Sequence, residues 1–204
     1  MTENGKGLLD VGKLVLAFAR VNRVTRYEDG VTPESDTDHT VMVSVSACAL
    51  AKKLYPDNLD IGLVAQFATV HDMVEVYAMD TASFGITEEG KKAKDARERE
   101  AFLRIQQEFK DVFPWLPEMI ERYESLDTKE ARFVKTVDKL MPKITHILNQ
   151  GAYFKSKGMD ADTMWSQYQS MVKDAELKYA KEFPEIMELM DELIREAKRV
   201  AYGE

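Results

Sequence analysis

Residues 59–80 read LDIGLVAQFATVHDMVEVYAMD, and this stretch decides the fold. Its apolar residues recur at the three- and four-residue spacing of a helix and cover almost the whole circumference, which is typical of a helix in the middle of a bundle. Three polar residues interrupt this surface, namely His71, Asp72 and Glu75. Because a buried carboxylate is costly unless it is paired, hydrogen-bonded or bound to a metal, packing alone does not explain them.

The helical spacing continues in both directions along the chain. It predicts helices over residues 6–22, 38–54, 59–79 and 87–113, a short helix after Pro117, a helix capped by Asp127 that runs to about Gln150 with a kink at Pro142, and two last helices that separate at Phe183-Pro184. We expect residues 27–35 to form a loop, and no alternating run predicts a strand. The fold class is therefore all-α, an irregular multi-helix bundle. We expect a single domain over residues 1–204, in which residues 151–204 are a C-terminal helical extension packed on the rest.

The composition limits the classes of partner. The 204 residues include 28 Lys and Arg against 36 Asp and Glu, and the net charge of −8 disfavours binding to nucleic acid. The apolar stretches 41–51 and 61–70 are too short to cross a membrane, and the first residues do not resemble a secretory signal. Cys48 is the only cysteine, and a free thiol is typical of a reducing compartment. We expect a soluble cytoplasmic protein that does not bind membranes.

The polar residues of the central helix indicate a metal site. His71 and Glu75 are four residues apart and Asp72 and Glu75 are three apart, so Glu75 lies one turn from both. Two carboxylates this close repel each other unless a cation lies between them. His39 and Asp138 can supply further ligands from two other predicted helices. A set of two imidazoles and two carboxylates favours Mn, Fe, Co, Ni or Zn over Ca.

Each of these residues also has an ordinary structural interpretation. Asp138 can pair with Lys135 or Lys139, and a single histidine near an apolar face is more often structural than a ligand. We give His146 that structural interpretation, because no pattern of partners surrounds it. The joint arrangement of the other candidates on separate helices is what favours a metal site.

Four blocks of the chain carry a resemblance to a known family. They are residues 33–39 (PESDTDH), 71–75 (HDMVE) with Asp80, 121–124 (ERYE) and 131–139 (ARFVKTVDK). They resemble the segments PES-x-[ST]-[DE]-H, HD-x-x-E followed by GD, EEYE, and A-[KR]-FVK-x-x-D-[KQ] of the HD-domain 5'-deoxynucleotidases. These enzymes belong to the HD superfamily of metal-dependent phosphohydrolases, so the resemblance implies the HD-domain fold. It covers roughly residues 8–150.

The resemblance assigns roles only where the positions match. It implies that the metal ligands are His39, His71, Asp72 and Asp138. In the same comparison, Glu75 matches the catalytic carboxylate of the family.

Two further residues match positions that contact the substrate. Asp80 matches an acidic residue near the sugar, with both a catalytic and a substrate-binding role, and Arg23 matches a phosphate-binding arginine that follows the first helix. The chain departs from the family at Val24, where Trp is usual, and at Met79, where Gly is common. Both departures concern the pocket for the sugar and the base.

The implied function is a 5'-nucleotidase that converts a deoxynucleoside monophosphate to a deoxynucleoside and phosphate. The implied cofactor is a divalent transition metal (Co, Mn, Fe, Ni or Zn), with Mg as a candidate second ion, and the implied assembly is a homodimer or a higher homo-oligomer. One alternative is a triphosphohydrolase that releases triphosphate and needs cations such as Arg20 or Arg26 beside Arg23. A more remote alternative is a non-catalytic helical binding protein with a structural metal, which would not need Glu75.

Overall fold

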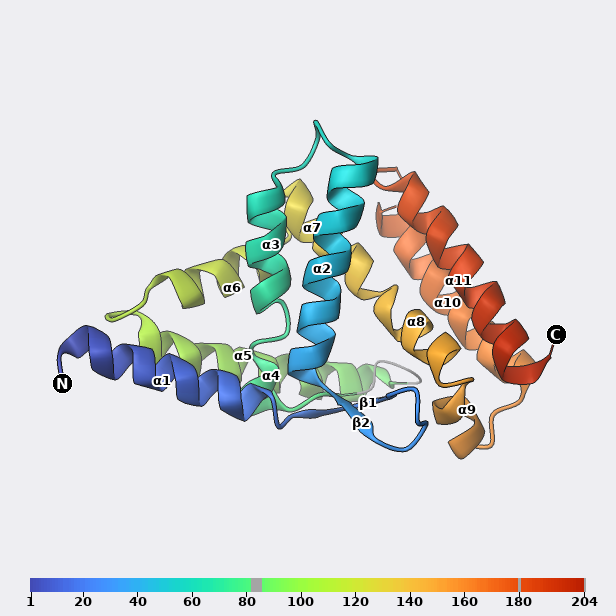
Figure 1. The fold of residues 1–204 in the computed structure, drawn as a ribbon, viewed down its shortest axis with the longest axis horizontal. Coiled ribbons are helices and arrows are strands. Elements are labelled where there is room, and N and C mark those ends of the chain that lie inside the picture. Colours follow the sequence, from blue (N-terminus) through green and yellow to red (C-terminus); the bar gives the residue numbers. More distant parts are fainter. Residues whose placement is uncertain (82–85, 180, 204) are drawn as a thin grey trace. The chain divides into compact units, whose positions relative to one another are not determined.

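The computed structural model describes residues 1–81, 86–179 and 181–203 (Figure 1). These residues are mainly helical with one two-stranded sheet, which confirms the predicted all-α class. The chain divides into two compact units. The first unit consists of Met1–Arg23 and Ser35–Val134, and the second of Val24–Glu34 and Lys135–Glu204. A single domain with an extension from residue 151 stays a prediction.

The first unit is a bundle of helices. They are α1 (Glu3–Phe18), α2 (Asp36–Leu54), α3 (Ile61–Val70), α4 (Glu75–Ala78), α5 (Glu88–Phe109), α6 (Trp115–Ser125) and the first part of α7 (Lys129–Asp138). α3 packs against α2 and α6, and α5 contacts α4 and α6 (Figure 1). Phe67 and Tyr123 are fully buried between these helices, with ring centres 6.1 Å apart. α3 therefore has the inner position that its apolar surface predicts.

Side-chain caps fix where the helices of the first unit begin. At the start of α2, the Ser35 hydroxyl accepts a hydrogen bond from the backbone N–H of Asp38, and Asp60 caps the first turn of α3 in the same way. Each cap satisfies donors that the first turn of a helix leaves unpaired. The cap on α2 fixes the turn that carries His39.

The single helix predicted over residues 59–79 is wrong. α3 ends at Val70, a turn follows, and the short helix α4 begins at Glu75. The backbone N–H of Glu75 bonds to the carbonyl of Asp72, three residues back, at 2.8 Å. Because such bonds wind the chain more tightly than an α-helix, the regular helix does not continue from Val70 to Glu75.

A hairpin replaces the end of the first predicted helix and the loop after it. The helix predicted over residues 6–22 stops before its expected end, and β1 (Asn22–Arg26) pairs with β2 (Pro33–Ser35). The expectation that the chain has no strand is therefore wrong. The carboxylate of Asp29 accepts two backbone N–H groups of the connecting loop at 2.8 Å, and Gly30 adopts a φ of 71°. Both features are usual in a tight turn.

The helix predicted from the cap at Asp127 to about Gln150 is two helices. α7 ends at Asp138, and α8 (Met141–Leu148) has Pro142 in its first turn. Proline has no backbone N–H to donate, so it suits a first turn but cannot continue the preceding helix. Pro142 therefore marks a break instead of the predicted kink.

The second unit contains α8, α9 (Ala152–Ser156), α10 (Ala161–Tyr179) and α11 (Pro184–Tyr202), and α11 packs against α8 and α10 (Figure 1). The predicted separation of the last two helices is confirmed, because α11 begins at Pro184. Gly151 has a φ of 71°, and a Cβ there would lie 2.5 Å from the Cβ of Ala201 on α11. Glycine is therefore required at this close approach. In the part of the chain that the structure describes, no helix is long and apolar enough to span a membrane.

Candidate metal centre

Three of the predicted metal ligands lie together in the first unit. They are His39 on α2 and His71 and Asp72 in the turn after α3. Each can offer one ligand atom, and these atoms lie within 4.8 Å of one another. Both histidines are buried, with 1% and 3% of their surface exposed. The structure therefore brings two predicted imidazole ligands and one predicted carboxylate ligand to one place.

A hydrogen bond fixes which nitrogen of His71 can bind a metal. Its Nδ1 lies 2.9 Å from the carbonyl oxygen of Ala68, and because a carbonyl only accepts, Nδ1 carries the proton. In the neutral ring Nε2 then carries the lone pair, and it lies 3.1 Å from Oδ2 of Asp72. A proton on Nε2, or a metal cation in its place, makes this contact with the carboxylate favourable. Support of one ring nitrogen by a backbone carbonyl is usual for metal-binding histidines, so His71 fits a metal ligand.

Asp72 is held in its ionised form by its neighbours. Its Oδ2 lies 2.8 Å from Nη1 of Arg23 and 3.7 Å from Nε2 of His39. Burial opposes ionisation, but His71, Arg23 and His39 together hold the pKa of Asp72 well below its usual range. The ionised carboxylate is the form that binds a metal, so Asp72 also fits.

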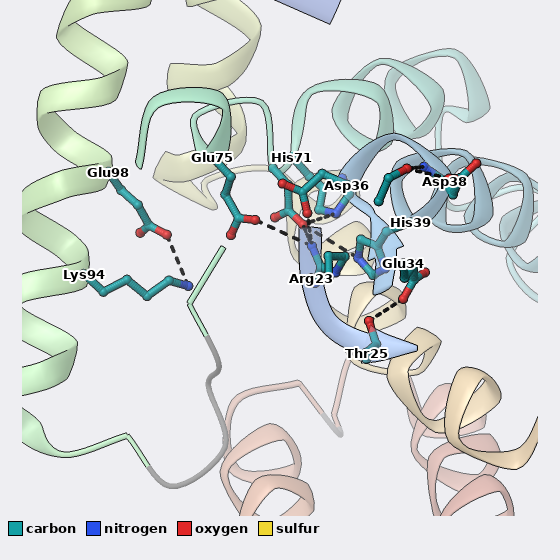
Figure 2. Close-up of polar contacts among 12 residues, drawn as sticks. Arg23, Thr25, Glu34, Asp36, Asp38, His39, His71, Glu75, Lys94 and Glu98 are labelled. Carbon is teal, nitrogen blue, oxygen red and sulfur yellow. Dashed lines mark hydrogen bonds and ion pairs between the residues drawn. The ribbon is translucent and has the colours of Figure 1, made fainter. Parts of the chain in front are cut away.

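Arg23 lies among carboxylates (Figure 2). Its Nη1 donates to Oδ2 of Asp72 at 2.8 Å and to Oδ1 of Asp36 at 3.0 Å. It also lies 3.6 Å from Oε2 of Glu75. The sequence pattern assigns no role to Asp36, because an aspartate in the first turn of a helix is common. Only its buried position beside Arg23 marks it as part of the site.

Two carboxyl groups of this cluster have raised pKa values. Burial and the negative charges of Asp72 and Asp36 raise the pKa of Glu75 to about 11. Burial also raises the pKa of Asp36 to about 6, against the opposing effect of Arg23. The charge of Asp80 contributes to both increases, so Asp80 lies within electrostatic reach of the cluster. A protonated Glu75 can act as a proton donor.

The residue before Asp80 has an unusual backbone. Met79 has a φ of 64° and a ψ of 146°, a combination that lies near a region populated almost only by glycine. It is the position at which the family that the chain resembles commonly has glycine. The backbone at Met79 therefore has the conformation expected of glycine, although the side chain departs from the family pattern.

Asp138 and His146 belong to the second unit. Asp138 is the last residue of α7, and its role as a fourth ligand stays a prediction. His146 is buried, and its Nδ1 is hydrogen-bonded to the hydroxyl of Tyr168. This contact agrees with the structural interpretation of His146, which stays a prediction.

Known proteins resemble this chain in sequence and in fold. The family model described as "HD domain" matches residues 18–196. A Mus musculus protein named 5'-deoxynucleotidase HDDC2 is 34% identical over 137 residues, which are 66% of this chain and 66% of that protein. The Bos taurus protein of the same name is 29% identical over 205 residues, covering 98% of this chain and 91% of the relative. A crystal structure of a predicted metal-dependent phosphohydrolase from Magnetospirillum magnetotacticum has a TM-score of 0.76 at 22% identity, covering 98% of each chain.

The chain belongs to the HD domain family, because the family model matches most of its length. The match extends past residue 150, where the resemblance described in the sequence analysis ends. The alignment with the mouse relative spans slightly less than two thirds of that protein, and the solved structure supports the fold alone. The family and the named relatives support a metal-dependent hydrolase, for which His39, His71 and Asp72 form a fitting metal site.

Proposed function

We propose that the protein is a metal-dependent 5'-nucleotidase that hydrolyses a deoxynucleoside monophosphate to a deoxynucleoside and phosphate. The observation that carries this proposal is the cluster of His39, His71 and Asp72 with the buried carboxyl group of Glu75 nearby. A metal held only for structure would not need a further buried carboxyl group beside its ligands. The names of the mouse and bovine relatives support the substrate class.

The metal would be held by His39, His71 and Asp72, with Asp138 as the fourth ligand. This donor set suits Mn, Fe, Co, Ni or Zn, and Mg is a candidate second ion. When bound, such a metal lowers the pKa of a water molecule and offsets negative charge on a phosphoryl group.

Glu75, Arg23 and Asp80 would act on the substrate. The buried carboxyl group of Glu75 would donate a proton to the 5' oxygen that leaves with the sugar. Arg23 offers a planar guanidinium, which suits the phosphate geometry better than a lysine would. We assign Asp80 to the sugar from the family resemblance, and its charge acts on Glu75.

A triphosphate is the less favoured substrate. It would bring more negative charge to the site than a monophosphate does, and Arg23 is already paired with the carboxylates of Asp36 and Asp72. Arg23 faces three carboxyl groups, and Arg26 donates instead to the backbone carbonyl of Val31. Since like charges repel most strongly at buried sites, a monophosphate fits these charges better.

Product analysis tests the proposal. The purified protein would be supplied with Co, Mn, Fe, Ni, Zn or Mg and a panel of deoxynucleoside mono- and triphosphates. We expect inorganic phosphate and a deoxynucleoside from at least one monophosphate, and no product from Asp72→Ala. The control Asp10→Ala, which changes an exposed carboxylate paired with Lys13 on α1, should keep full activity. Release of inorganic triphosphate would favour the triphosphohydrolase, and metal binding without any turnover would favour a structural metal.

We also propose a cytoplasmic homodimer in which α2 of one copy packs against α2 of the other. Val41 and Val45 expose 56% and 65% of their surface on this helix. Asp38 and Lys52 lie seven residues on either side of Val45, so antiparallel pairing about Val45 would place opposite charges across the interface. In analytical ultracentrifugation, Val45→Glu should be monomeric, whereas Leu8→Glu, at an exposed position of α1, should stay dimeric. A monomeric wild-type protein would contradict this assembly.

A further inference from the structure

Asp36 is a buried carboxylate to which neither the family resemblance nor the proposed reaction assigns a role. It is the first residue of α2, its side chain has no exposed surface, and its backbone N–H bonds to the carbonyl of Val21 at 3.1 Å. Oδ1 accepts a hydrogen bond from Nη1 of Arg23 at 3.0 Å. Oδ2 is also buried, and among the described residues it has no hydrogen-bond partner. The contact with Arg23 therefore dominates the polar surroundings of Asp36.

The start of the helix does not explain Asp36. Ser35 already caps α2, and a carboxylate in the first turn gains only a modest, salt-sensitive stabilisation from the helix dipole. An exposed side chain would obtain the same benefit without losing its hydration. Burying a carboxylate costs more than the dipole returns, so Asp36 needs its cationic partner.

Arg23 is held from more than one direction (Figure 2). One nitrogen, Nη1, lies 3.0 Å from Oδ1 of Asp36, 2.8 Å from Oδ2 of Asp72 and 3.6 Å from Oε2 of Glu75. Asp72 and Glu75 are the groups to which we assign metal binding and proton donation. Asp36 is the one member of this set that has no other task, and it comes from a different helix.

We propose that Asp36 is a positioning residue that anchors the guanidinium of Arg23 beside Asp72 and Glu75, so that Arg23 meets the substrate phosphate in a fixed orientation. This inference rests on the phosphate-binding role assigned to Arg23 in the proposed function. An arginine side chain loses much rotational freedom when it is held in one geometry. The contact with Asp36 removes that freedom during folding, before the phosphate binds.

The variant Asp36→Asn tests this role, because asparagine keeps the size and the acceptor oxygen but loses the charge. We expect KM for a deoxynucleoside monophosphate to rise about tenfold and kcat to change by less than about twofold, since only binding is affected. Inhibition by inorganic phosphate should weaken by the same factor, and Mn affinity should not change. The matched control is Asp162→Asn, an exposed aspartate in the first turn of α10, which should leave KM and kcat unchanged.

A double-mutant cycle with Arg23→Lys separates positioning from a general structural role. If Asp36 acts through Arg23, the Asp36→Asn substitution should add less than about twofold to the effect of Arg23→Lys on KM. Effects that multiply, a fall in kcat with KM unchanged, or a lower KM in Asp36→Asn would each overturn the proposal. A lower KM in Asp36→Asn would mean that Asp36 only neutralises the charge of Arg23 and so weakens its attraction for the phosphate.

A measurement of phosphate binding tests the role of Asp36 even if the proposed reaction does not occur. Should the wild-type protein hydrolyse no deoxynucleoside monophosphate, the proposed function fails, but calorimetry of inorganic phosphate with the Mn-loaded protein still reports on Asp36. An approximately tenfold weaker phosphate affinity in Asp36→Asn, absent in the Arg23→Lys background, would support the positioning role. Equal phosphate affinity in wild type and Asp36→Asn would overturn it.

Discussion

Each unit of the chain buries titratable side chains, and the two units satisfy them in different ways. In the second unit, Nζ of the buried Lys143 donates to the carbonyl of Lys139 at 2.6 Å and lies 5.3 Å from the ring centre of Tyr168. His146 is hydrogen-bonded to the same tyrosine, and its ring centre lies 4.4 Å from that of Phe154. Burial lowers the pKa of Lys143 to about 7 and that of His146 to about 3. These groups are enclosed by aromatic rings and favour their neutral forms.

In the first unit, the titratable groups carry opposite charges and form ion pairs. Arg23 and the ionised Asp72 are 2.8 Å apart, and two imidazoles lie within reach of the same carboxylate. Oδ2 of Asp36 and Oε2 of Glu75 are buried without a hydrogen-bond partner among the described residues. Burying a carboxyl oxygen without such a partner is costly, which favours a cation or ligand bound at this cluster. The cluster in the first unit therefore has the character of a binding site and the cluster in the second unit that of a polar core, although each contains a buried histidine.

The largest expected effect comes from replacing the two buried histidines, His71 and His146, by alanine in separate variants. His71→Ala should abolish metal binding and reduce activity by at least about 10³-fold, because it removes a ligand. His146→Ala should keep the metal and the activity, while the free energy of unfolding falls by about 2–4 kcal/mol from the cavity and the lost hydrogen bond. Metal content, turnover and urea unfolding of both variants measure this difference. Full metal occupancy in His71→Ala would contradict the site assignment.

Glu75→Gln should have the next largest effect. Glutamine keeps the shape of the side chain but cannot donate a carboxyl proton, so kcat should fall by about 10²–10⁴-fold while the bound metal stays. Single-turnover rates and metal content measured on the same sample separate the two properties. Loss of metal from this variant would mean that Glu75 is a ligand instead of a proton donor.

The metal site was more predictable from sequence than its surroundings. His71 and Asp72 could be found because they interrupt an apolar helical pattern, and burial makes such interruptions costly. His39 could be found as one of three histidines, at the start of another predicted helix. Asp36 could not be found, because a first-turn aspartate is ordinary and only the fold shows that it is buried. For Asp80 and Arg23 the family resemblance, and not the spacing, provided the signal.

The fold was predictable where helices are long and regular. The helices over residues 88–109 and 184–202 lie where the spacing and Pro184 place them. The hairpin was missed because strands of five and three residues are too short to show alternation. The break after Val70 was missed because apolar spacing does not report a local change from four-residue to three-residue hydrogen bonding.

Lys143→Met should stabilise the second unit, and the gain should depend on pH. Folding lowers the pKa of Lys143 from 10.5 to about 7, so the unfolded chain binds the proton more readily. The contribution of wild-type Lys143 to the free energy of unfolding is therefore most favourable above pH 10.5, and this contribution is lost as the pH falls toward 7. We expect the variant to gain on the order of 1–4 kcal/mol at pH 7 and almost nothing near pH 11. Urea unfolding at both pH values measures this gain.

An exposed lysine of the same unit provides the control for this comparison. Lys155→Met changes a side chain on α9 that solvent already surrounds, so its stability should differ from wild type by less than about 0.5 kcal/mol at either pH. If Lys143→Met is no more stable than Lys155→Met at pH 7, the buried lysine is fully compensated by its hydrogen bond. The contrast between the two clusters would then be weaker than their contacts indicate.

The smallest expected effect concerns backbone strain, which both units contain. Met79, next to Asp80, and the exposed Gln150 of the second unit have φ values of 64° and 56°. Glycine relieves about 1–2 kcal/mol of strain at such a position and costs about 0.5–1 kcal/mol in chain entropy, so Met79→Gly and Gln150→Gly should each raise Tm by about 1–4 °C. Only Met79→Gly should also lower KM for a deoxynucleotide, by about two- to threefold, because it removes a side chain beside the residue that we assign to the sugar. Calorimetric melting and steady-state kinetics on the two variants separate these effects. An equal change of KM in Gln150→Gly would show that the strain at Met79 has no particular connection with the site.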